Sequence, residues 1–368
     1  HRCNSYKKIQ VSDSVEIRLI PSSGYKKNVG FARLFDHMIL AKNLKKLLLQ
    51  EKTRPDVAFI GYPPIESASI MIHWLAKRNI PCLLDVKDQW PSFIIDALPK
   101  WGKGIGRVLL SPYFYLARRA MKEATGLTAM ADDFLMWALN FSNRKRTDKD
   151  IVVPLTTANF EVGANEMESS KQWWAERGVI DNKKIKIMFV GSHYPSLDFS
   201  PIFEAAALFT EQGVECDFII CGHGELTESL IIKAKNYENI LFPGWVDRPK
   251  VEELAKMSMA SIAPFRNIDC YMKSLPNKVI DSLSLGLPIL SPLKGEVRRL
   301  INVEKVGLEY KEGSGESLYS RIIKLSHNES LCQKISENAT VLYNQRFSYE
   351  VVYGGLVKHL EKIVIKND

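Results

Sequence analysis

The sequence predicts an α/β protein made of two doubly wound domains in tandem. Short β-branched runs alternate with helical patterns from Val15 onward, which is typical of βα units around a parallel sheet. The chain has 368 residues, about twice the length of an ordinary domain. Hydrophobic residues make up 46% of the chain and charged residues 25%, which excludes disordered and fibrous classes.

The first half contains β-branched runs that predict strands at 15–20, 56–62, 80–86, 126–131 and 151–155. Helical patterns fill the gaps between them, at 30–50, 66–78, 104–123 and 131–141. Residues 142–150 are polar and highly charged, and predict a surface loop. The loop contains Asp148-Lys149-Asp150, which we do not interpret as a metal-binding motif because it lacks apolar flanks.

A second βα series follows a less regular stretch that ends near Asn182. It predicts strands at 184–191, 216–221, 239–242, 259–264, 288–291 and 307–310. It predicts helices at 199–212, 225–237, 248–257, 276–285, 295–302 and onward to the C-terminus. We therefore expect two domains, at 1–155 and 156–345, and a final helix at 346–368.

The positive charge lies in the first half of the sequence. Residues 1–150 hold 25 Lys and Arg against 14 Asp and Glu, whereas residues 151–368 hold 25 against 28. Such asymmetry favours an anionic partner, either a membrane surface, a nucleic acid or a phosphorylated substrate; the alternative is a solvated basic face. Nucleic acid is the weaker choice, because the aromatic residues lie in apolar runs.

Residues 99–122 mix aromatic and basic side chains, as interfacial segments do. A core helix with cations at its ends is the competing interpretation. If the segment meets a membrane, the residues on that side are Lys100, Trp101, Lys103, Arg107, Arg118 and Arg119.

The cysteines and the apolar runs bear on the compartment. No run approaches the roughly 18 apolar residues of a spanning helix. The six cysteines form no CxxC pair, so neither a disulfide framework nor a metal knuckle is indicated, and a reducing compartment is favoured. We expect a cytoplasmic protein, peripheral on the inner face of the plasma membrane.

Two glycine loops follow predicted strands of the second half. The first contains Gly191, Ser192 and His193, and the second contains Gly222, His223 and Gly224. Glycine at the carboxyl end of a parallel strand lets backbone amides approach a ligand, and a following helix N-terminus favours phosphate. Each loop alone could be a tight turn, but together they predict a nucleotide site.

A third loop is the most specific. A polar segment after a predicted strand leads to Pro276, which starts a helix, and an acid follows one turn later. This order places cations where a diphosphate would bind, and Asp281 where it could accept from ribose hydroxyls. The alternative is a helix with an N-terminal proline and an incidental acid. The ligand-binding candidates here are Arg266, Lys273, Ser274, Asn277, Lys278 and Asp281.

Several motifs resemble the retaining glycosyltransferases of family 4. In the second half these are Phe189-Val190-Gly191, Gly222-x-Gly224-Glu225, Gly244-Trp245-Val246, and Pro276-Asn277-Lys278-Val279-Ile280-Asp281 with Gly286-x-Pro288. In the first half, Asp85-Val86-Lys87-Asp88-Gln89-Trp90-Pro91 is similar to an element of the branch that builds bacterial surface polysaccharides (O-antigen and capsule) on lipid-linked intermediates.

The resemblance implies a GT-B fold, with two Rossmann-like domains facing across a cleft. It makes 1–155 the acceptor-side domain and 156–345 the nucleotide-sugar-binding domain, with the helix at 346–368 packing back on the N-terminal domain. It adds Trp245 to the donor-binding residues. It implies metal-independent transfer of a hexosyl or N-acetylhexosaminyl group from a UDP- or GDP-linked sugar, as co-substrate, to a hydroxyl of a lipid-linked glycan. No cofactor is expected. Asp88 and Lys273 are the catalytic candidates, with Asp88 contacting the acceptor hydroxyl or the sugar.

The sequence also departs from the family. Its pair of acids, eight residues apart, falls on Lys273 and Asp281, so the charge of the first is reversed. A basic pair common in the family is replaced by residues such as Ser192 and His193, so the diphosphate cation must come from Lys273, Lys278 or Arg266. The N-terminal domain lacks its first βα unit, and we expect a truncated sequence.

These departures leave three functions open at this point. The favoured function is a glycosyltransferase of cell-surface polysaccharide, such as lipopolysaccharide, biosynthesis. The alternatives are a catalytically weak relative that acts as a regulatory or assembly subunit, and a nucleotide-sugar epimerase of the same fold.

Overall fold

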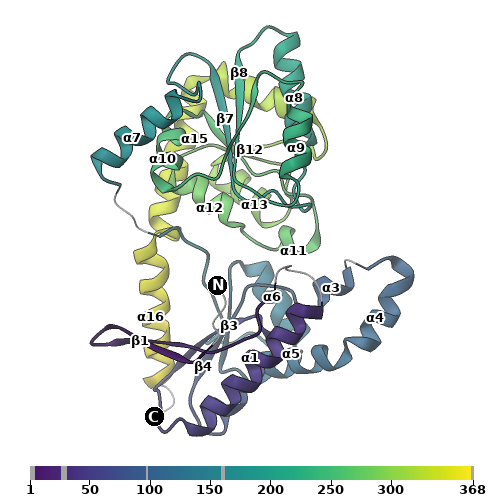
Figure 1. Cartoon of the computed structure of the whole chain (residues 1–368), viewed down its shortest axis with the longest axis vertical. Helices are drawn as coiled ribbons and strands as arrows, with labels where there is room; N and C mark the ends of the chain where they lie inside the picture. The colour runs from purple at the N-terminus through teal and green to yellow at the C-terminus, as the bar shows by residue number, and fades with distance from the viewer. Residues whose placement is uncertain (1–4, 26–30, 97, 159–161, 366–368) are drawn as a thin grey trace. The chain divides into compact units, whose positions relative to one another are not determined.

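The computed structural model describes residues 5–25, 31–96, 98–158 and 162–365. The chain divides into two compact units (Figure 1). The first unit consists of His1–Val153 together with Leu356–Asp368, and the second of Pro154–Gly355. Each unit has its own parallel sheet.

The first unit is built on four parallel strands in the order β3, β4, β5, β6. The strands of this unit are β1 (Lys7–Ser12), β2 (Val15–Leu19), β3 (Ala58–Tyr62), β4 (Cys82–Val86), β5 (Gly126–Ala129) and β6 (Ile151–Val152). Its helices are α1 (Phe31–Gln50), α2 (Ile65–Ala76), α3 (Ser92–Asp96), η1 (Lys100–Gly102), α4 (Lys103–Leu109), α5 (Ser111–Glu123) and α6 (Asp132–Phe141). The helix predicted at 104–123 is two helices, because Pro112 starts a new one.

The strand predicted at 15–20 exists, but it does not belong to the parallel sheet. It is β2, which pairs antiparallel with β1 in a separate two-stranded sheet. Only Asp13 and Ser14 connect the two strands, and a connection that short permits only an antiparallel hairpin. The expectation that Val15 opens the parallel series is therefore wrong, because the residues before it form a partner strand.

Strand β4 forms the centre of the first unit, and all five of its residues are buried. Asp85 on this strand accepts a hydrogen bond from the Thr128 hydroxyl at 2.7 Å. Where β4 ends, the Tyr62 hydroxyl donates to the Trp90 carbonyl at 2.6 Å. These bonds fix the loop that carries Asp88.

The charged segment 142–150 is anchored by its last residue. Asp150 is 3% exposed, and its carboxylate accepts from the Leu127 amide at 2.8 Å and from Arg144 at 2.9 Å. The amide and the hydroxyl of Thr147 also donate to it, each at 2.8 Å. The segment is a loop as predicted, but Asp150 is a buried structural acid that ties this loop to β5.

The second unit has a six-stranded parallel sheet in the order β12, β11, β10, β7, β8, β9. Its strands are β7 (Ile185–Val190), β8 (Cys216–Cys221), β9 (Ile240–Gly244), β10 (Ala260–Ile262), β11 (Ile289–Ser291) and β12 (Gly307–Glu309). The chain runs outward from β7 to β9, returns to β10 beside β7, and then runs outward in the other direction. The strand order therefore reverses between β7 and β10, where doubly wound folds bind ligands.

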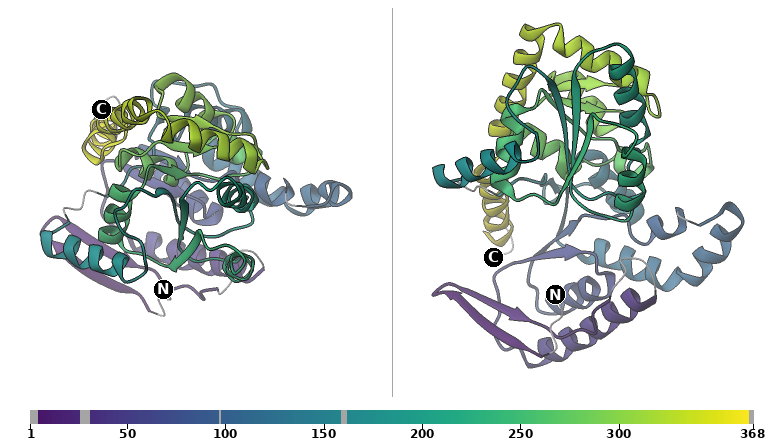
Figure 2. Two further views of the ribbon diagram at one scale, coloured as in Figure 1. Left: turned by 90° about the horizontal axis from the view of Figure 1, so that it is seen from above. Right: turned by 45° about the horizontal axis from the view of Figure 1, so that its top comes forward.

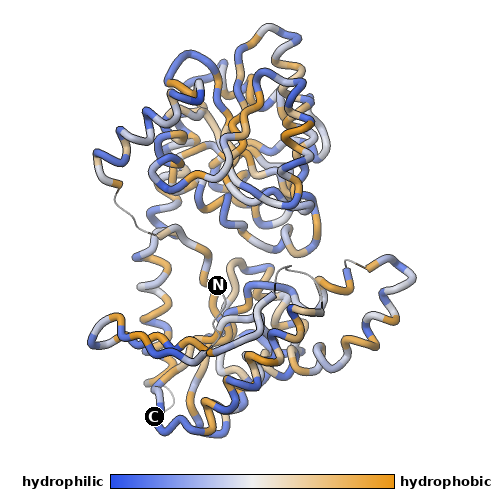
Figure 3. Tube along the Cα trace, in the orientation of Figure 1, coloured by the Kyte–Doolittle hydropathy of each residue, from blue (hydrophilic) through white to orange (hydrophobic). Residues whose placement is uncertain are grey.

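Helices cover both faces of this sheet, with α8 and α9 on one side and α7 and α10 on the other (Figures 1 and 2). Hydrophobic residues gather on the central strands (Figure 3). The helices of the unit are α7 (Ala164–Ala175), α8 (Ser200–Glu211), α9 (Thr227–Ala234), α10 (Arg248–Met257), α11 (Asp269–Met272), α12 (Asn277–Ser284), α13 (Glu296–Glu304), α14 (Gly315–Ser326), α15 (Glu329–Leu342) and the π-helix η2 (Tyr343–Phe347).

Helix α7 lies in the stretch predicted to be irregular. Its apolar content is low, but Trp174 is fully buried and its indole N–H donates to the Lys250 carbonyl at 2.8 Å. Tertiary packing against α10 therefore stabilises a helix that its own periodicity does not indicate.

The last helix is α16 (Tyr349–Ile365). Its first turns belong to the second unit, and its residues from Leu356 onward belong to the first. Within the described residues, no helix combines the length and hydropathy needed to cross a bilayer.

Candidate functional site

Two glycines bring the ends of β7 and β8 into close contact. Gly191 has a φ of +143° and Gly222 a φ of +120°, values that side chains with a Cβ rarely adopt. A Cβ on Gly222 would lie 2.0 Å from the Gly191 carbonyl oxygen, so only glycine fits. The Gly191 amide donates to the Cys221 carbonyl at 3.0 Å and the Gly222 amide to the Gly244 carbonyl at 2.7 Å.

The Lys278 ammonium lies directly against Gly191. A Cβ on Gly191 would lie 1.6 Å from Lys278 Nζ, so the missing side chain makes room for this cation. The amine donates to the Val190 carbonyl at 3.0 Å and lies 4.6 Å from the centre of the Phe189 ring. Burial lowers the pKa of Lys278 to about 8, although Asp281 opposes the shift. Helix α12 thus places a partly desolvated cation at the switch point of the sheet.

Asp281 follows Lys278 by one turn of α12 and is half-buried. Burial raises the pKa of its carboxyl group, and Lys278 and Arg248 act in the opposite direction. A cation and a carboxylate therefore share one face of a short helix, which begins directly after Pro276. This arrangement suits a ligand that carries both phosphates and hydroxyl donors.

His193 does not occupy the position predicted for it. Its side chain is fully buried, with Nδ1 2.8 Å from the Thr227 hydroxyl oxygen and its ring packed against Phe189 and Phe199. Burial lowers the pKa of this imidazole. His193 therefore supports the loop from inside, and the expectation that it contacts a donor is wrong.

The other predicted residues of these loops divide into exposed and packed ones. Ser192 and His223 are exposed beyond the ends of β7 and β8, and the Trp245 side chain beyond β9 is 74% exposed. Gly224 packs against the backbone of His193, where a Cβ would come within 2.6 Å of two backbone atoms.

The third loop presents its residues in the same way. Asn277 is exposed at the start of α12, whereas Ser274 is buried and its hydroxyl donates to the Tyr271 carbonyl at 3.1 Å. The exposed residues are available to a ligand, and the packed ones shape the backbone of the loop.

Two predicted cations are already engaged within the protein. Lys273 Nζ lies 2.6 Å from the Asp269 carboxylate, one turn earlier. Arg266 Nε donates to the Pro195 carbonyl at 3.2 Å, and another of its nitrogens lies 3.6 Å from Asp198. Three residues were candidates for the diphosphate cation. Of these, Lys278 has its amine against Gly191, at the point between β7 and β10 where the strand order reverses.

Asp88, the candidate of the first unit, lies just beyond the carboxyl end of β4 and is half-buried. Burial raises the pKa of this carboxyl group, while the Gln89 amide and Arg33 act in the opposite direction. The Arg33 guanidinium lies 4.5 Å from the centre of the Trp90 ring. The predicted acid thus belongs to a polar cluster at this edge of the sheet.

Three members of that cluster were not predicted from the sequence: Arg33, His37 and Glu66. His37 is 5% exposed and Glu66 9% exposed, with Nδ1 and the carboxylate 3.8 Å apart. Burial lowers the pKa of the His37 imidazole. These three residues come from the first turns of α1 and α2. The only sequence signal was that Glu66 lies shortly after a predicted strand and two prolines, with Ile65 between.

The residues predicted on the membrane side lie on η1, α4 and α5. A cavity of about 1250 Å³ lies in the same part of the first unit and is lined by residues of α3 to α6. Arg107, Arg118 and Arg119 are among the lining residues.

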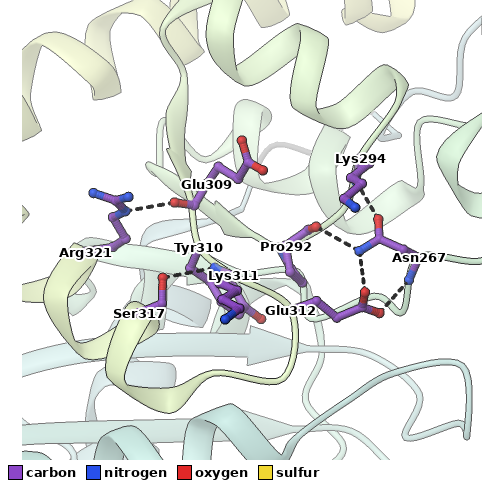
Figure 4. A pocket seen from close by; sticks show the side chains of 9 residues that line it. All are labelled: Asn267, Pro292, Lys294, Glu309, Tyr310, Lys311, Glu312, Ser317 and Arg321. Atoms are coloured by element: carbon purple, nitrogen blue, oxygen red, sulfur yellow. Dashed lines mark hydrogen bonds between the residues drawn. The ribbon is translucent and has the colours of Figure 1, made fainter.

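A smaller cavity, of about 560 Å³, lies in the second unit at the carboxyl ends of β11 and β12 (Figure 4). The Asn267 amide nitrogen donates to the Glu312 carboxylate at 2.8 Å, and Arg321 donates to the Glu309 carbonyl at 2.9 Å. None of the predicted donor-binding residues line this cavity. Throughout the described ranges, no group of three or more His, Cys, Asp or Glu side chains could hold a metal ion.

Comparison with known proteins finds a family match within the second unit. Residues 170–341 match the family model described as glycosyl transferases group 1. An uncharacterized glycosyltransferase of Methanocaldococcus jannaschii is 27% identical over 266 residues, which cover 68% of this chain and 63% of that protein. The match thus spans less than two thirds of that relative's length.

Solved structures show the fold. Sucrose-phosphate synthase from Thermosynechococcus elongatus has a TM-score of 0.73 at 12% identity, over 99% of this chain and 87% of that one. Anabaena HepE in complex with UDP has a TM-score of 0.61 at 12% identity, over 88% and 82%. HepE in complex with UDP-glucose has a TM-score of 0.62 at 12% identity, over 91% and 84%. The chain has the GT-B fold, which confirms the predicted fold class.

Proposed function

We propose that this chain, whose residues 170–341 match the model of glycosyl transferases group 1, is a glycosyltransferase that moves a sugar from a nucleotide diphosphate sugar to a hydroxyl group. The observation that carries the proposal is the position of Lys278. Its amine lies against Gly191 at the point where the strand order of a doubly wound sheet reverses. The UDP and UDP-glucose complexes of HepE, which shares the fold, support a nucleotide sugar as the donor.

The donor diphosphate is assigned to the glycine loops and Lys278. Helix α12 begins at Asn277, one residue before Lys278, and the backbone amides of a helix N-terminus favour phosphate. Asp281, one turn further, accepts from the ribose hydroxyls. The base, uracil or guanine, lies toward Trp245, where an exposed indole ends β9.

The chemistry that these groups provide is stabilisation of the leaving diphosphate. Negative charge develops on the phosphate oxygens as the glycosidic bond breaks, and a preorganised cation with backbone donors lowers the energy of that state. Lys278 loses little solvation on binding, because it is already partly desolvated in the free protein. We propose metal-independent transfer of a hexosyl or N-acetylhexosaminyl group with retention of the anomeric configuration.

The acceptor is assigned to the first unit. Asp88, with its pKa raised by burial, is the candidate that receives the proton of the acceptor hydroxyl or orients the sugar. The excess of basic residues in 1–150 supports an acceptor with negative charge, such as a diphosphate-linked lipid glycan. We therefore place the reaction in cell-surface polysaccharide synthesis, at the cytoplasmic face of a membrane.

The test begins with nucleotide binding. Isothermal titration calorimetry with UDP, GDP and ADP should detect binding of UDP or GDP, and Lys278→Met should weaken it. Lys294→Met, in the same unit but on the separate cavity, is the matched control and should bind as the wild type does. If none of the three nucleotides binds at millimolar concentration, the proposal is refuted.

The second step is transfer from a panel of UDP- and GDP-sugars to polyprenyl-diphosphate-linked acceptors. Product with a retained anomeric configuration would support the proposed reaction, and inversion would refute its stereochemistry. One alternative is a regulatory subunit. It is favoured because Lys273 stands where the family has its first acid, and the Lys273 amine pairs with Asp269. Nucleotide binding without transfer or hydrolysis of any donor is the result that this alternative predicts.

A further inference from the structure

The segment formed by η1 and α4 exposes large hydrophobic side chains. Trp101 is 82% exposed, Ile105 61%, and Val108 and Leu109 each 73%. These four positions are spaced i, i+4, i+7 and i+8, so they form one stripe along the helical segment. The opposite side packs inward through Gly106, where a Cβ would lie 2.5 Å from Leu98. The apolar face of this segment therefore points to solvent.

A row of cations lies beside the hydrophobic stripe. Lys100, Lys103 and Arg107 are spaced i, i+3 and i+7, which places them on a second face of the same segment. Between Asp96 and Glu123 the sequence has six Lys and Arg residues and no acid. Polar and hydrophobic residues alternate along this segment (Figure 3). An apolar stripe next to a basic one is typical of helices that lie in the interface of a membrane.

The cavity of about 1250 Å³ continues this surface. Arg107 belongs both to the basic row and to the cavity, whose other cations are Arg118, Arg119 and Lys122. Arg119 pairs with Glu123 at 2.7 Å. In the described part of the chain, no carboxylate lies within salt-bridge distance of the other three cations. Arg118 lies over the rings of Phe114 and Phe141, at 5.8 and 5.2 Å.

We propose that the cavity and the exposed stripe of η1 and α4 together dock the first unit on a membrane of anionic phospholipid. The phosphate group of a lipid enters the cavity and is bound by Arg107, Arg118 and Lys122, while the stripe that begins at Trp101 inserts among the acyl chains. The biological role of this docking rests on the proposed function, because the enzyme would meet a lipid-linked acceptor at the membrane. The docking itself requires neither nucleotide nor acceptor.

Charge complementarity favours a lipid surface over a second copy of the chain. Lys103 pairs with Asp96 at 3.4 Å, but a symmetric dimer through this face would still bring two rows with an excess of cations together, which costs energy for every opposed pair. An anionic membrane neutralises all the cations at once, and its hydrocarbon region accepts the exposed apolar side chains.

The test uses the full chain with phosphatidylcholine vesicles that contain about one third phosphatidylglycerol, and with pure phosphatidylcholine vesicles. Co-sedimentation should show binding to the anionic vesicles only, and the binding should weaken with added salt. The variant Arg107→Ser/Arg118→Ser/Lys122→Ser should bind roughly 100-fold more weakly. The matched control is Lys235→Ser/Lys324→Ser/Lys334→Ser, which removes three exposed cations from the second unit and should bind as the wild type does.

A second variant tests insertion without changing charge. Trp101→Ser/Leu109→Ser alters only exposed side chains, so it should fold normally but bind the anionic vesicles at least several-fold more weakly. Lipids brominated in the acyl chains should quench wild-type tryptophan fluorescence, and Trp101→Phe should remove most of that quenching while the protein stays bound.

Three results would overturn the inference. They are failure of the wild type to bind anionic vesicles, equal weakening by the two triple variants, and acyl-chain quenching that Trp101→Phe leaves unchanged. Calorimetry with UDP separates this inference from the proposed function, because all these variants should bind nucleotide alike. Vesicle binding without nucleotide binding would sink the proposed function alone.

Discussion

Lys278 gives nucleotide binding a distinctive pH dependence, because burial lowers the pKa of its amine to about 8. An amine with this pKa is about 90% protonated at pH 7 and only about 10% protonated at pH 9, whereas an ordinary lysine stays protonated throughout. Only the protonated amine attracts a diphosphate, so the affinity for UDP should fall roughly tenfold between pH 7 and pH 9. The phosphates do not change charge over this range, since their second pKa is about 6.

The assay is isothermal titration calorimetry of UDP at pH 7, 8 and 9 and constant ionic strength. Uridine is titrated in parallel, because it lacks phosphates and reports only the ionisation of the base. Lys278→Met keeps the apolar stem and removes the amine. It should bind UDP roughly 10- to 150-fold more weakly than the wild type at pH 7, the range expected for one hydrogen bond to a charged group. Its affinity should not change with pH.

Lys278 does not bind the diphosphate if the wild type and Lys278→Met bind UDP equally at pH 7 and show the same pH profile. Such a result would place the diphosphate away from the loop that contains Gly191. Urea unfolding of both proteins at pH 7 provides the control for folding, because the amine also donates to a backbone carbonyl of β7.

Three further predictions concern residues that shape the two units. Gly222→Ala should lower the free energy of unfolding by about 3 kcal/mol in urea titrations, because it combines a strained φ with a backbone overlap. Gly213→Ala is the control and should cost about 1 kcal/mol, because Gly213 has a positive φ but open space around it. Equal costs for the two variants would contradict the prediction. Asp150→Asn should lower the free energy of unfolding by about 3 to 5 kcal/mol, because it breaks the buried ion pair with Arg144. A decrease below about 1 kcal/mol would show that Asp150 does not anchor the loop. His193 has a lowered pKa in the folded protein, so the unfolded chain binds a proton at this residue first as the pH falls below about 6.5. Between pH 7 and pH 5 the free energy of unfolding of the wild type should therefore drop more than that of His193→Gln, by at most about 2 kcal/mol. If the free energies of unfolding of the two proteins change equally with pH, the pKa of His193 does not differ between the folded and unfolded states.

The strand ends of the second unit could be predicted from the sequence, because buried runs followed by glycine are local signals. The pattern that ends at Gly191 and the one that ends at Gly222 mark β7 and β8, and the order of a doubly wound sheet then brings their loops together. The helix start after Pro276 is equally local. Lys278 could therefore be placed near these loops before any coordinates.

Side-chain direction could not be predicted. His193 comes two residues after Gly191, and nothing in the sequence shows that the loop turns its ring into the core beside Thr227. The pairing of Lys273 with Asp269 depends on a four-residue helix too short to give a periodic pattern. The rotamer and the short helix are set by tertiary packing, which a single sequence does not display.

The polar cluster of the first unit was also beyond sequence reasoning. Arg33, His37 and Glu66 come from the first turns of two helices, and Asp88 from a loop after a strand, so their proximity depends on how the helices pack on the sheet. Hairpin β1–β2 was missed for a related reason. A hydrophobic alternation in exposed strands identifies neither their partners nor their direction.

Helix α16 contributes residues to the first unit, and this determines the order in which the two units can finish folding during translation. The first unit consists of two stretches of the chain, one before and one after the second unit in sequence, and His359 of α16 lies 3.1 Å from the Lys149 carbonyl oxygen. A ribosome therefore releases every residue of Pro154–Gly355 before it releases the segment that completes the unit synthesised first. The second unit can fold while the first still exposes the surface that Leu356 and Ile363 later cover. A nascent chain that has emerged from the ribosome only as far as Gly355 would have one finished unit and one open to chaperones.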